Sequence, residues 1–97
     1  MKENKMEHYL IVRFKKGVDV KDLYEPIRDL FSQAGNIEGI KKAQVYLSSS
    51  KLRNNYDMMI RFTMKKSSLP LLENSDLYRR FREDYSDSIS RVTEFDA

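Results

Sequence analysis

The 97-residue chain contains no cysteine and no tryptophan, and it has three glycines, two prolines and one histidine. Without cysteine, the chain has no disulfides, no thiolate catalysis and no cysteine-based zinc or iron–sulfur site. The lone histidine, His8, cannot build a histidine-cluster metal site. The three glycines are isolated from one another, which excludes a glycine-rich loop that cradles phosphate. We therefore expect no metal and no tightly bound cofactor.

Long apolar runs are missing as well. No segment approaches the ~20 apolar residues of a membrane span. Residues 1–7 are polar and lack the apolar region of a signal peptide. We expect no membrane partner, a cytoplasmic location, a disordered tail over residues 1–6 and a single domain over residues 7–97.

Basic residues exceed acidic ones by only three, and the two kinds are interspersed along the chain. The densest basic run contains Arg79, Arg80 and Arg82, but acidic residues follow it directly. A solvated, ion-paired helix face explains this run better than a phosphate-binding patch does. The charge pattern therefore gives no support to a nucleic-acid partner.

The first strand is the most informative segment that is present. Residues 8–14 read His-Tyr-Leu-Ile-Val-Arg-Phe, and successive side chains on a strand point to opposite faces. His8 therefore shares an apolar face with Leu10, Val12 and Phe14, while the opposite face is itself half apolar. Both faces of this strand therefore need other protein segments to cover them from water.

The remaining pattern predicts the element order β-α-β-β-α-β. Asp19 can cap a helix that extends to Phe31, and Pro26 inside it marks either a first-turn position or a kink. Ser75 can cap a second helix whose apolar stripe ends at Ile89. The other predicted elements are strands over 40–47, 56–64 and 91–95, a polar loop over 48–55 and a short helical piece over 67–73.

This order predicts an α+β, ferredoxin-like fold, with a four-stranded antiparallel sheet and both helices on one face. The uncovered face is too apolar for water, so we expect a homodimer that packs two sheets into a dimeric α/β barrel. Buried charges need partners, and Asp57 is expected to pair with Arg13 or Arg61. The predicted dimer-interface residues are Tyr9, Ile11, Arg13, Gln44, Tyr46, Asp57, Met59 and Arg61.

Three segments resemble the stress-responsive dimeric α/β-barrel (Dabb) family. The opening strand, residues 8–15, looks like the family's His-plus-aliphatic strand ending in Phe-Lys. Ile37–Ile40 lies where the family has its Pro-Gly-Val-like turn, and Tyr56 with Asp57 resembles the family's Tyr-Asp pair. The resemblance implies the dimeric barrel fold and a stress-linked role.

The chain also departs from the family pattern. Members often carry His-Pro-x-His at the start of the second long helix, where this chain has Asn74-Ser75-Asp76-Leu77. In the polyketide-cyclase branch the second of these histidines works with an earlier tyrosine, and the matching positions here are Leu77 and Leu71. The resemblance therefore carries over the fold but not the cyclase activity.

The same element order also occurs in RNA-recognition motifs, which carry glycines and exposed aromatic residues on their third strand. Here that strand has no glycine, and its uncovered face carries Asp57, Met59 and Arg61 instead of aromatic residues. RNA stacking is therefore not expected.

Two functional hypotheses remain open. The first is a homodimeric binder of a small apolar molecule, with a cleft near His8. The second is a cofactor-free enzyme (cyclase, isomerase or monooxygenase-like) that uses His8 with a pocket tyrosine, for which Tyr24, Tyr78 and Tyr85 are candidates. A purely structural His8, bonded to backbone or to a helix side chain, is the alternative to both. The predicted pocket residues are His8, Leu10, Val12, Leu30, Met58, Ile60, Leu77 and Phe81, and no catalytic residue is assigned.

Overall fold

The computed structural model describes residues 4–49 and 56–97. Its strands form one antiparallel sheet in the spatial order β2-β3-β1-β4. The strands are β1 (Lys5–Phe14), β2 (Ile40–Leu47), β3 (Met58–Lys65) and β4 (Ile89–Asp96). The predicted α+β, ferredoxin-like fold is confirmed.

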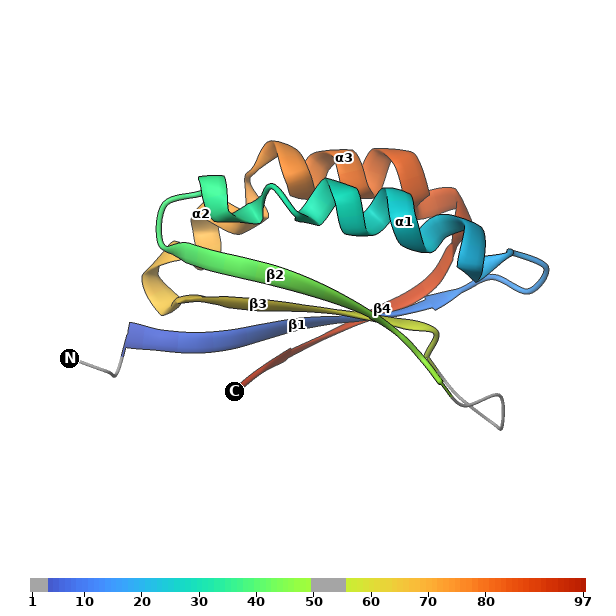
Figure 1. Ribbon diagram of the computed structural model, residues 1–97, viewed down its shortest axis with the longest axis horizontal. Coiled ribbons are helices and arrows are strands. Elements are labelled where there is room, and N and C mark those ends of the chain that lie inside the picture. The colour runs from blue at the N-terminus through green and yellow to red at the C-terminus, as the bar shows by residue number, and fades with distance from the viewer. Residues whose placement is uncertain (1–3, 50–55) are drawn as a thin grey trace.

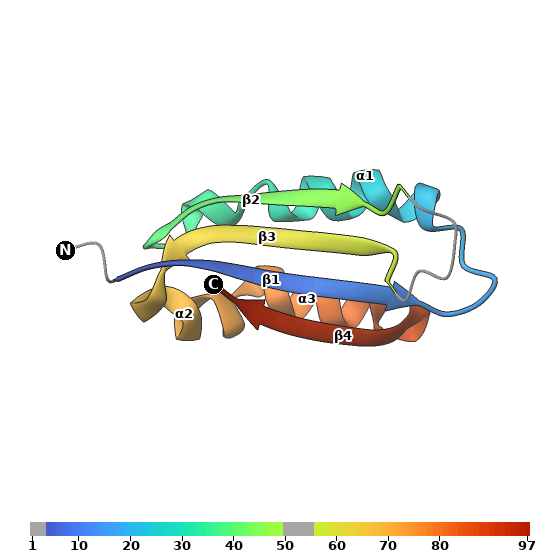
Figure 2. The same cartoon turned by 90° about the horizontal axis from the view of Figure 1, so that it is seen from below.

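The helices α1 (Val20–Phe31), α2 (Leu69–Glu73) and α3 (Asp76–Tyr85) all lie on one face of the sheet (Figure 1). Short 3-10 turns, η2 (Ala34–Asn36), η3 (Lys66–Ser68) and η4 (Ser86–Ser88), join them to the strands. Seen from below, the strands lie in front of the helices and nothing covers them among the described residues (Figure 2). We call this uncovered side the open face.

Both predicted helix caps are present. The Asp19 carboxylate accepts a hydrogen bond from the backbone N–H of Lys21 at 3.2 Å, and the Ser75 hydroxyl accepts one from Tyr78 at 3.3 Å. These bonds satisfy amides that the first helical turn leaves unpaired. Because α1 begins directly after Asp19, Pro26 lies inside the helix and not in its first turn.

Three predicted boundaries are wrong. The third strand was predicted to begin at residue 56, but β3 begins at Met58. The first strand begins at Lys5, and Met6 is buried opposite Met64 of β3, so these two residues do not belong to a tail. The apolar side chain of Met6 gains more from the core than from water, which extends the strand. At the other end, Ile89 begins β4 and does not continue the helix. The predicted loop over 48–55 lies for the most part outside the described residues.

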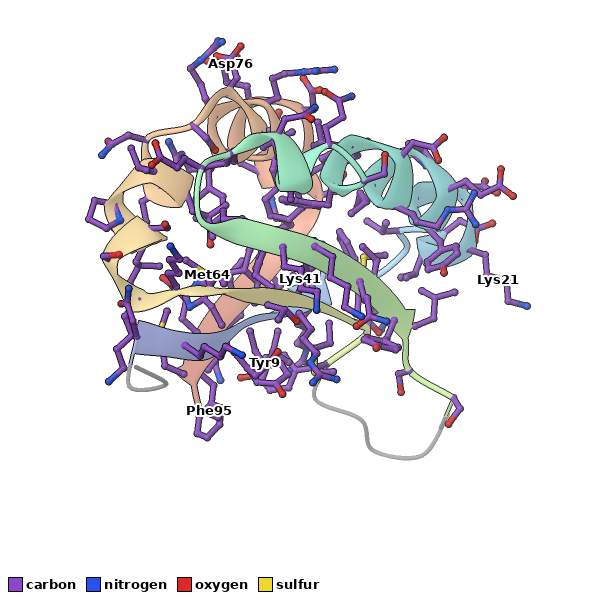
Figure 3. All side chains as sticks on the ribbon, turned by 60° about the vertical axis from the view of Figure 1, so that its left-hand side comes forward. Tyr9, Lys21, Lys41, Met64, Asp76 and Phe95 are labelled. Carbon is purple, nitrogen blue, oxygen red and sulfur yellow. The ribbon has the colours of Figure 1, made fainter. Side chains whose placement is uncertain are left out.

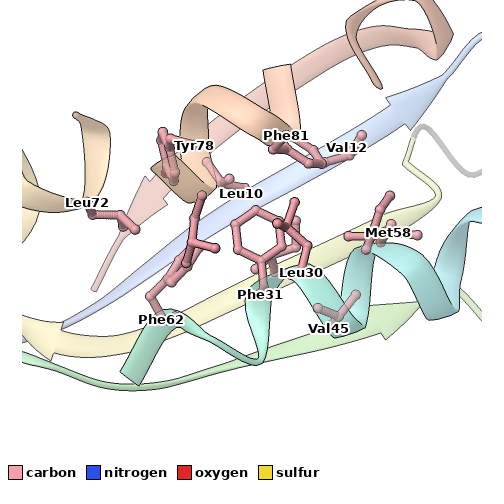
Figure 4. Packing of buried hydrophobic residues seen from close by; sticks show 14 of the residues in the cluster. Leu10, Val12, Leu30, Phe31, Val45, Met58, Phe62, Leu72, Tyr78 and Phe81 are labelled. Atoms are coloured by element: carbon pink, nitrogen blue, oxygen red, sulfur yellow. The ribbon is translucent and has the colours of Figure 1, made fainter. Parts of the chain in front are cut away.

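The core fills the space between the sheet and the helices (Figure 4). The Phe31 ring of α1 lies 5.5 Å from the Phe62 ring of β3 and 5.3 Å from the Phe81 ring of α3, between centroids. All three side chains are buried, and each contributes about 1.5–3 kcal/mol by leaving water. This aromatic group holds α1 and α3 in place over the sheet. None of the described helices combines the length and the apolar character that crossing a bilayer requires.

Candidate functional site

His8 is buried between the sheet and α3, with 1% of its surface exposed. Its Nδ1 contacts a carboxylate oxygen of Asp96. Its Nε2 lies 3.1 Å from the Tyr78 hydroxyl and 3.2 Å from a carboxylate oxygen of Glu94. The imidazole is therefore held between two carboxylates and a phenol.

The register of β1 with β4 creates this group. His8 pairs with Asp96 and Leu10 pairs with Glu94, so both carboxylates lie on the strand face that carries His8. The Ser75 cap starts α3 three residues before Tyr78, which places Tyr78 in the first helical turn above the sheet. The Tyr78 ring packs 6.2 Å from the ring of Phe62, which pairs with His8 on β3.

The electrostatics assign a direction to the hydrogen bonds. Burial, followed by the negative charges of Glu94, Glu73 and Asp96, raises the pKa of Tyr78 far above its usual value. Tyr78 is therefore a neutral phenol that can donate its proton. Because the Asp96 carboxylate can only accept, Nδ1 of His8 donates to it. In the neutral ring, Nε2 then accepts from Tyr78; in the doubly protonated ring, Nε2 donates to Glu94.

The His8 group meets solvent through the two carboxylates. The side chains of Glu94 and Asp96 are 54% and 50% exposed, because β4 is an edge strand. The predicted tyrosine partner is Tyr78, while the hydroxyl of Tyr24 donates instead to the Val45 carbonyl at 3.3 Å. Glu94 and Asp96 were not among the predicted site residues. Strand alternation around the outward-facing Phe95 was the signal that could have found them.

The other residues predicted to line a cleft near His8 lie in the hydrophobic core. Each of them is 7% exposed or less and packs against other core side chains. These residues are Leu10, Val12, Leu30, Met58, Ile60, Leu77 and Phe81.

A pocket of about 800 Å³ lies elsewhere, at the end of the sheet where β1 and β2 begin and β3 ends. Met6 and Met64 reach it from the helix-covered face, two residues along their strands from His8 and Phe62. We call it the end pocket. Its lining comes from residues 4–7 of β1 and the turn before it, residues 35–41 of the η2 turn, the loop after it and the start of β2, and residues 63–65 of β3.

The loop at the end pocket depends on Gly39. Its φ is +84°, and a Cβ at this position would collide with the buried side chain of Ser68. Only glycine fits such a backbone and such an approach. Lys65 then donates its backbone N–H to the Gly39 carbonyl at 2.9 Å, which ties the loop to the end of β3.

The open face carries the predicted interface residues of the three strands β1, β2 and β3. Tyr9 packs against Phe95 of β4 at 6.0 Å between ring centroids, on the side away from the helices (Figure 3). The alternation of the paired strands places seven predicted residues on this face: Tyr9, Ile11, Arg13, Gln44, Tyr46, Met59 and Arg61.

The predicted ion pair of Asp57 with Arg13 or Arg61 is wrong within the protomer. Its carboxylate accepts the backbone N–H of Phe14 at 2.9 Å. Arg61 instead pairs with Glu7, at 2.8 Å between Nε and Oε1, and Thr63 donates to the same oxygen at 3.1 Å. Strand pairing explains the difference, because Glu7 and Thr63 lie directly opposite each other and Arg61 lies one step away on the same face.

In the part of the chain that the structure describes, no group of three or more histidine, aspartate or glutamate side chains could hold a metal ion. The arrangement around His8 therefore offers proton transfer and hydrogen bonding, and the end pocket offers a binding volume.

No family model matches the chain, and no curated protein matches it. Several solved structures do match the chain. A dimeric ferredoxin-like protein of unknown function from Thermobifida fusca has a TM-score of 0.79, 12% identity, and coverage of 96% of this chain and 89% of its own. A Dabb family protein from Mesorhizobium loti has a TM-score of 0.64, 13% identity, and coverage of 96% and 94%. Hydroxynitrile lyase from Passiflora edulis has a TM-score of 0.73, 11% identity, and coverage of 97% and 92%. At these identities the similarity shows the fold alone, and it is the ferredoxin-like fold of the dimeric protein and the Dabb family protein named above.

Proposed function

We propose that the protein is a homodimeric small-molecule-binding domain whose ligand occupies the end pocket. The observation that carries this proposal is the pocket itself, because about 800 Å³ lies within the ~300–1,000 Å³ of typical ligand sites. Its apolar wall includes Met6, Ile40 and Met64, which are core residues with 8%, 5% and 4% of their surface exposed. Methionine adapts its shape to an apolar ligand, so this wall suits a small apolar molecule.

The end pocket explains binding better than the surroundings of His8 do. The seven apolar residues predicted there are packed into the core, and none of them lines the pocket. The predicted ligand class is therefore retained, and its proposed position moves about two residues along β1, from His8 to Met6.

Octan-1-ol, a neutral and soluble apolar probe, tests this site. We expect a titration followed by amide NMR shifts to perturb Ile37, Ile40 and Met64 in a saturable way. Shifts centred on Leu10 and Leu77 would instead place the ligand in the predicted cleft near His8. Absence of any saturable shift would refute the binding function.

The dimer is supported by the open face. Tyr46 is 39% exposed and Phe95 is 58% exposed on this face, next to the partly buried Tyr9, Ile11 and Met59. A second copy would cover these side chains from water by a two-fold interface of the same patch. Within the protomer Arg61 is already neutralised by Glu7, which lowers the cost of covering it. Two of the solved structures of this fold are described as dimeric proteins.

A cofactor-free enzyme is the second candidate, and the contact between His8 and Tyr78 favours it. A carboxylate, an imidazole and a neutral phenol in sequence are the parts of an acid–base relay. The role of Tyr78 would be to donate a proton, and that of Asp96 to orient the His8 ring. The burial of His8 counts against this function, since a substrate must reach one of these groups.

Access to His8 can be measured with diethyl pyrocarbonate, because the chain has one histidine and its modification is unambiguous. An enzyme that uses His8 requires modification of the folded protein under native conditions. Modification that waits for urea unfolding would refute this candidate and leave His8 as a structural residue. The stress-linked role and the cytoplasmic location stay predictions from the sequence.

A further inference from the structure

The end pocket has an uneven distribution of charge. Its lining includes Lys5, Lys41 and Lys65 as cations and Glu7 and Glu38 as anions. Glu7, however, is bonded to a partner that does not line the pocket. The Arg61 side chain, the largest influence, holds the pKa of Glu7 below its usual range, so this carboxylate is already neutralised by an ion pair. The lining then carries three ammonium groups and one carboxylate, that of Glu38, for which the described residues show no ion pair.

One of these lysines, Lys41, lies at a β-bulge. Ile40 pairs with Met64 and Lys42 pairs with Thr63, so Lys41 is an extra residue between two consecutive pairs. Such a bulge bends its strand and redirects a side chain, often beside a functional site. The carbonyl oxygen of Lys41 also lies close to Gly35, where a Cβ would meet it at 3.3 Å. The bulge and the η2 turn therefore form one wall of the pocket.

The cations lie next to the apolar part of the lining. Lys65 directly follows Met64 on β3, and Lys41 directly follows Ile40 on β2. Figure 3 shows Lys41 and Met64 on neighbouring strands at this part of the sheet. By strand alternation the Lys65 side chain leaves β3 on the face opposite Met64, but its Cδ lies 3.7 Å from the position that a Cβ would take at Gly39, which brings Lys65 to the loop before Ile40. A ligand whose tail contacts Met6, Ile40 and Met64 can therefore reach Lys65 with its polar end.

We propose that the end pocket binds a free amphipathic carboxylate, with its aliphatic tail on the methionine–isoleucine wall and its carboxylate beside Lys41 and Lys65. This inference rests on the proposed function, because it names the ligand class of the same site. The net positive charge of the lining selects an anion over a neutral or cationic molecule with the same tail. The carboxylate satisfies two lysine ammonium groups without the loss of an existing ion pair.

Three probes with one tail test the inference: octanoate, octan-1-ol and octylammonium, each titrated at low salt and followed by amide NMR shifts. We expect octanoate to bind several-fold more tightly than octan-1-ol, and octylammonium to bind most weakly. Added salt should bring octanoate and octan-1-ol together, because exposed charges are screened beyond about 10 Å at ~0.1 M.

The test variant combines Lys41→Gln with Lys65→Gln. The control variant combines Lys16→Gln with Lys21→Gln and removes the same charge far from the pocket. Figure 3 shows Lys21 well apart from Lys41 and Met64. Each exposed ion pair is worth a factor of about two to five, so the first pair of substitutions should weaken octanoate binding about tenfold. Octan-1-ol binding should not change.

The outcomes separate the two proposals. Equal affinities for octanoate and octan-1-ol, or an equal loss in the control variant, would overturn the carboxylate inference and leave the binding function intact. If none of the three probes binds at the end pocket, both the inference and the proposed function are refuted.

Discussion

Replacing His8 and Tyr78 singly and together measures how strongly their contact couples β1 to α3. His8→Leu places an apolar side chain in this buried position, but it leaves the buried Tyr78 hydroxyl without Nε2 of His8 as its hydrogen-bond partner. An abandoned buried hydroxyl costs about 1–3 kcal/mol. Tyr78→Phe removes the hydrogen bond between the Tyr78 hydroxyl and Nε2 of His8, so we expect a loss of about 0.5–1.5 kcal/mol.

The double variant should be less destabilised than the sum of the single ones. With Leu and Phe in place, both polar groups are gone and no buried atom is left without a partner. We expect a coupling free energy of about 1 kcal/mol, equivalent to ~4–8 °C in Tm for a domain of this size. Urea unfolding followed by circular dichroism gives the four free energies, at one protein concentration because dimerisation changes apparent stability.

The matched control is Tyr85→Phe, which removes a phenol from the same helix. The Tyr85 ring packs on the Phe81 ring at 5.8 Å between centroids and does not contact His8, so the effect of Tyr85→Phe should add to that of His8→Leu. If the free-energy changes of His8→Leu and Tyr78→Phe also add up to that of the double variant within about 0.3–0.5 kcal/mol, the two side chains are not energetically coupled and the reasoning is refuted.

Three further outcomes are expected. Ile11→Glu, on the open face, should sediment as a monomer at micromolar concentration, whereas Gln33→Glu, which adds the same charge on an exposed turn, should remain dimeric; a monomeric parent would contradict the interface. The pKa of Glu7 is lowered from 4.5 by its guanidinium partner, so its ion pair stabilises the fold above pH 4.5, and that stability is lost as the pH falls through the folded pKa. The free-energy gap between the parent and Glu7→Gln should therefore shrink in acid, and a gap that persists there would assign it to packing. Gly39→Ala should destabilise the fold by about 1–3 kcal/mol and clearly more than Gly17→Ala, since both have positive φ but a Cβ at Gly17 meets open space; equal Tm losses would show that the collision is relieved.

Alternation and capping were readable from the sequence because they depend on neighbours in the chain. The two faces of residues 8–14, the Asp19 and Ser75 caps and the start of β2 at Ile40 are all as predicted. The end of the last helix was not, because Ile89 continues an apolar helical spacing and only its pairing with Phe14 makes it a strand residue.

The sequence by itself determined the fold class and the orientation of His8, since periodic burial of apolar side chains allows one arrangement of these strands and helices. The tertiary structure alone decided the partners of His8 and the position of the pocket. Asp96 lies 88 residues from His8, and their contact depends on the register of two strands. The end pocket likewise combines three separate segments with a bulge at Lys41. Such long-range register follows from the packing of the whole sheet, and no local pattern encodes it.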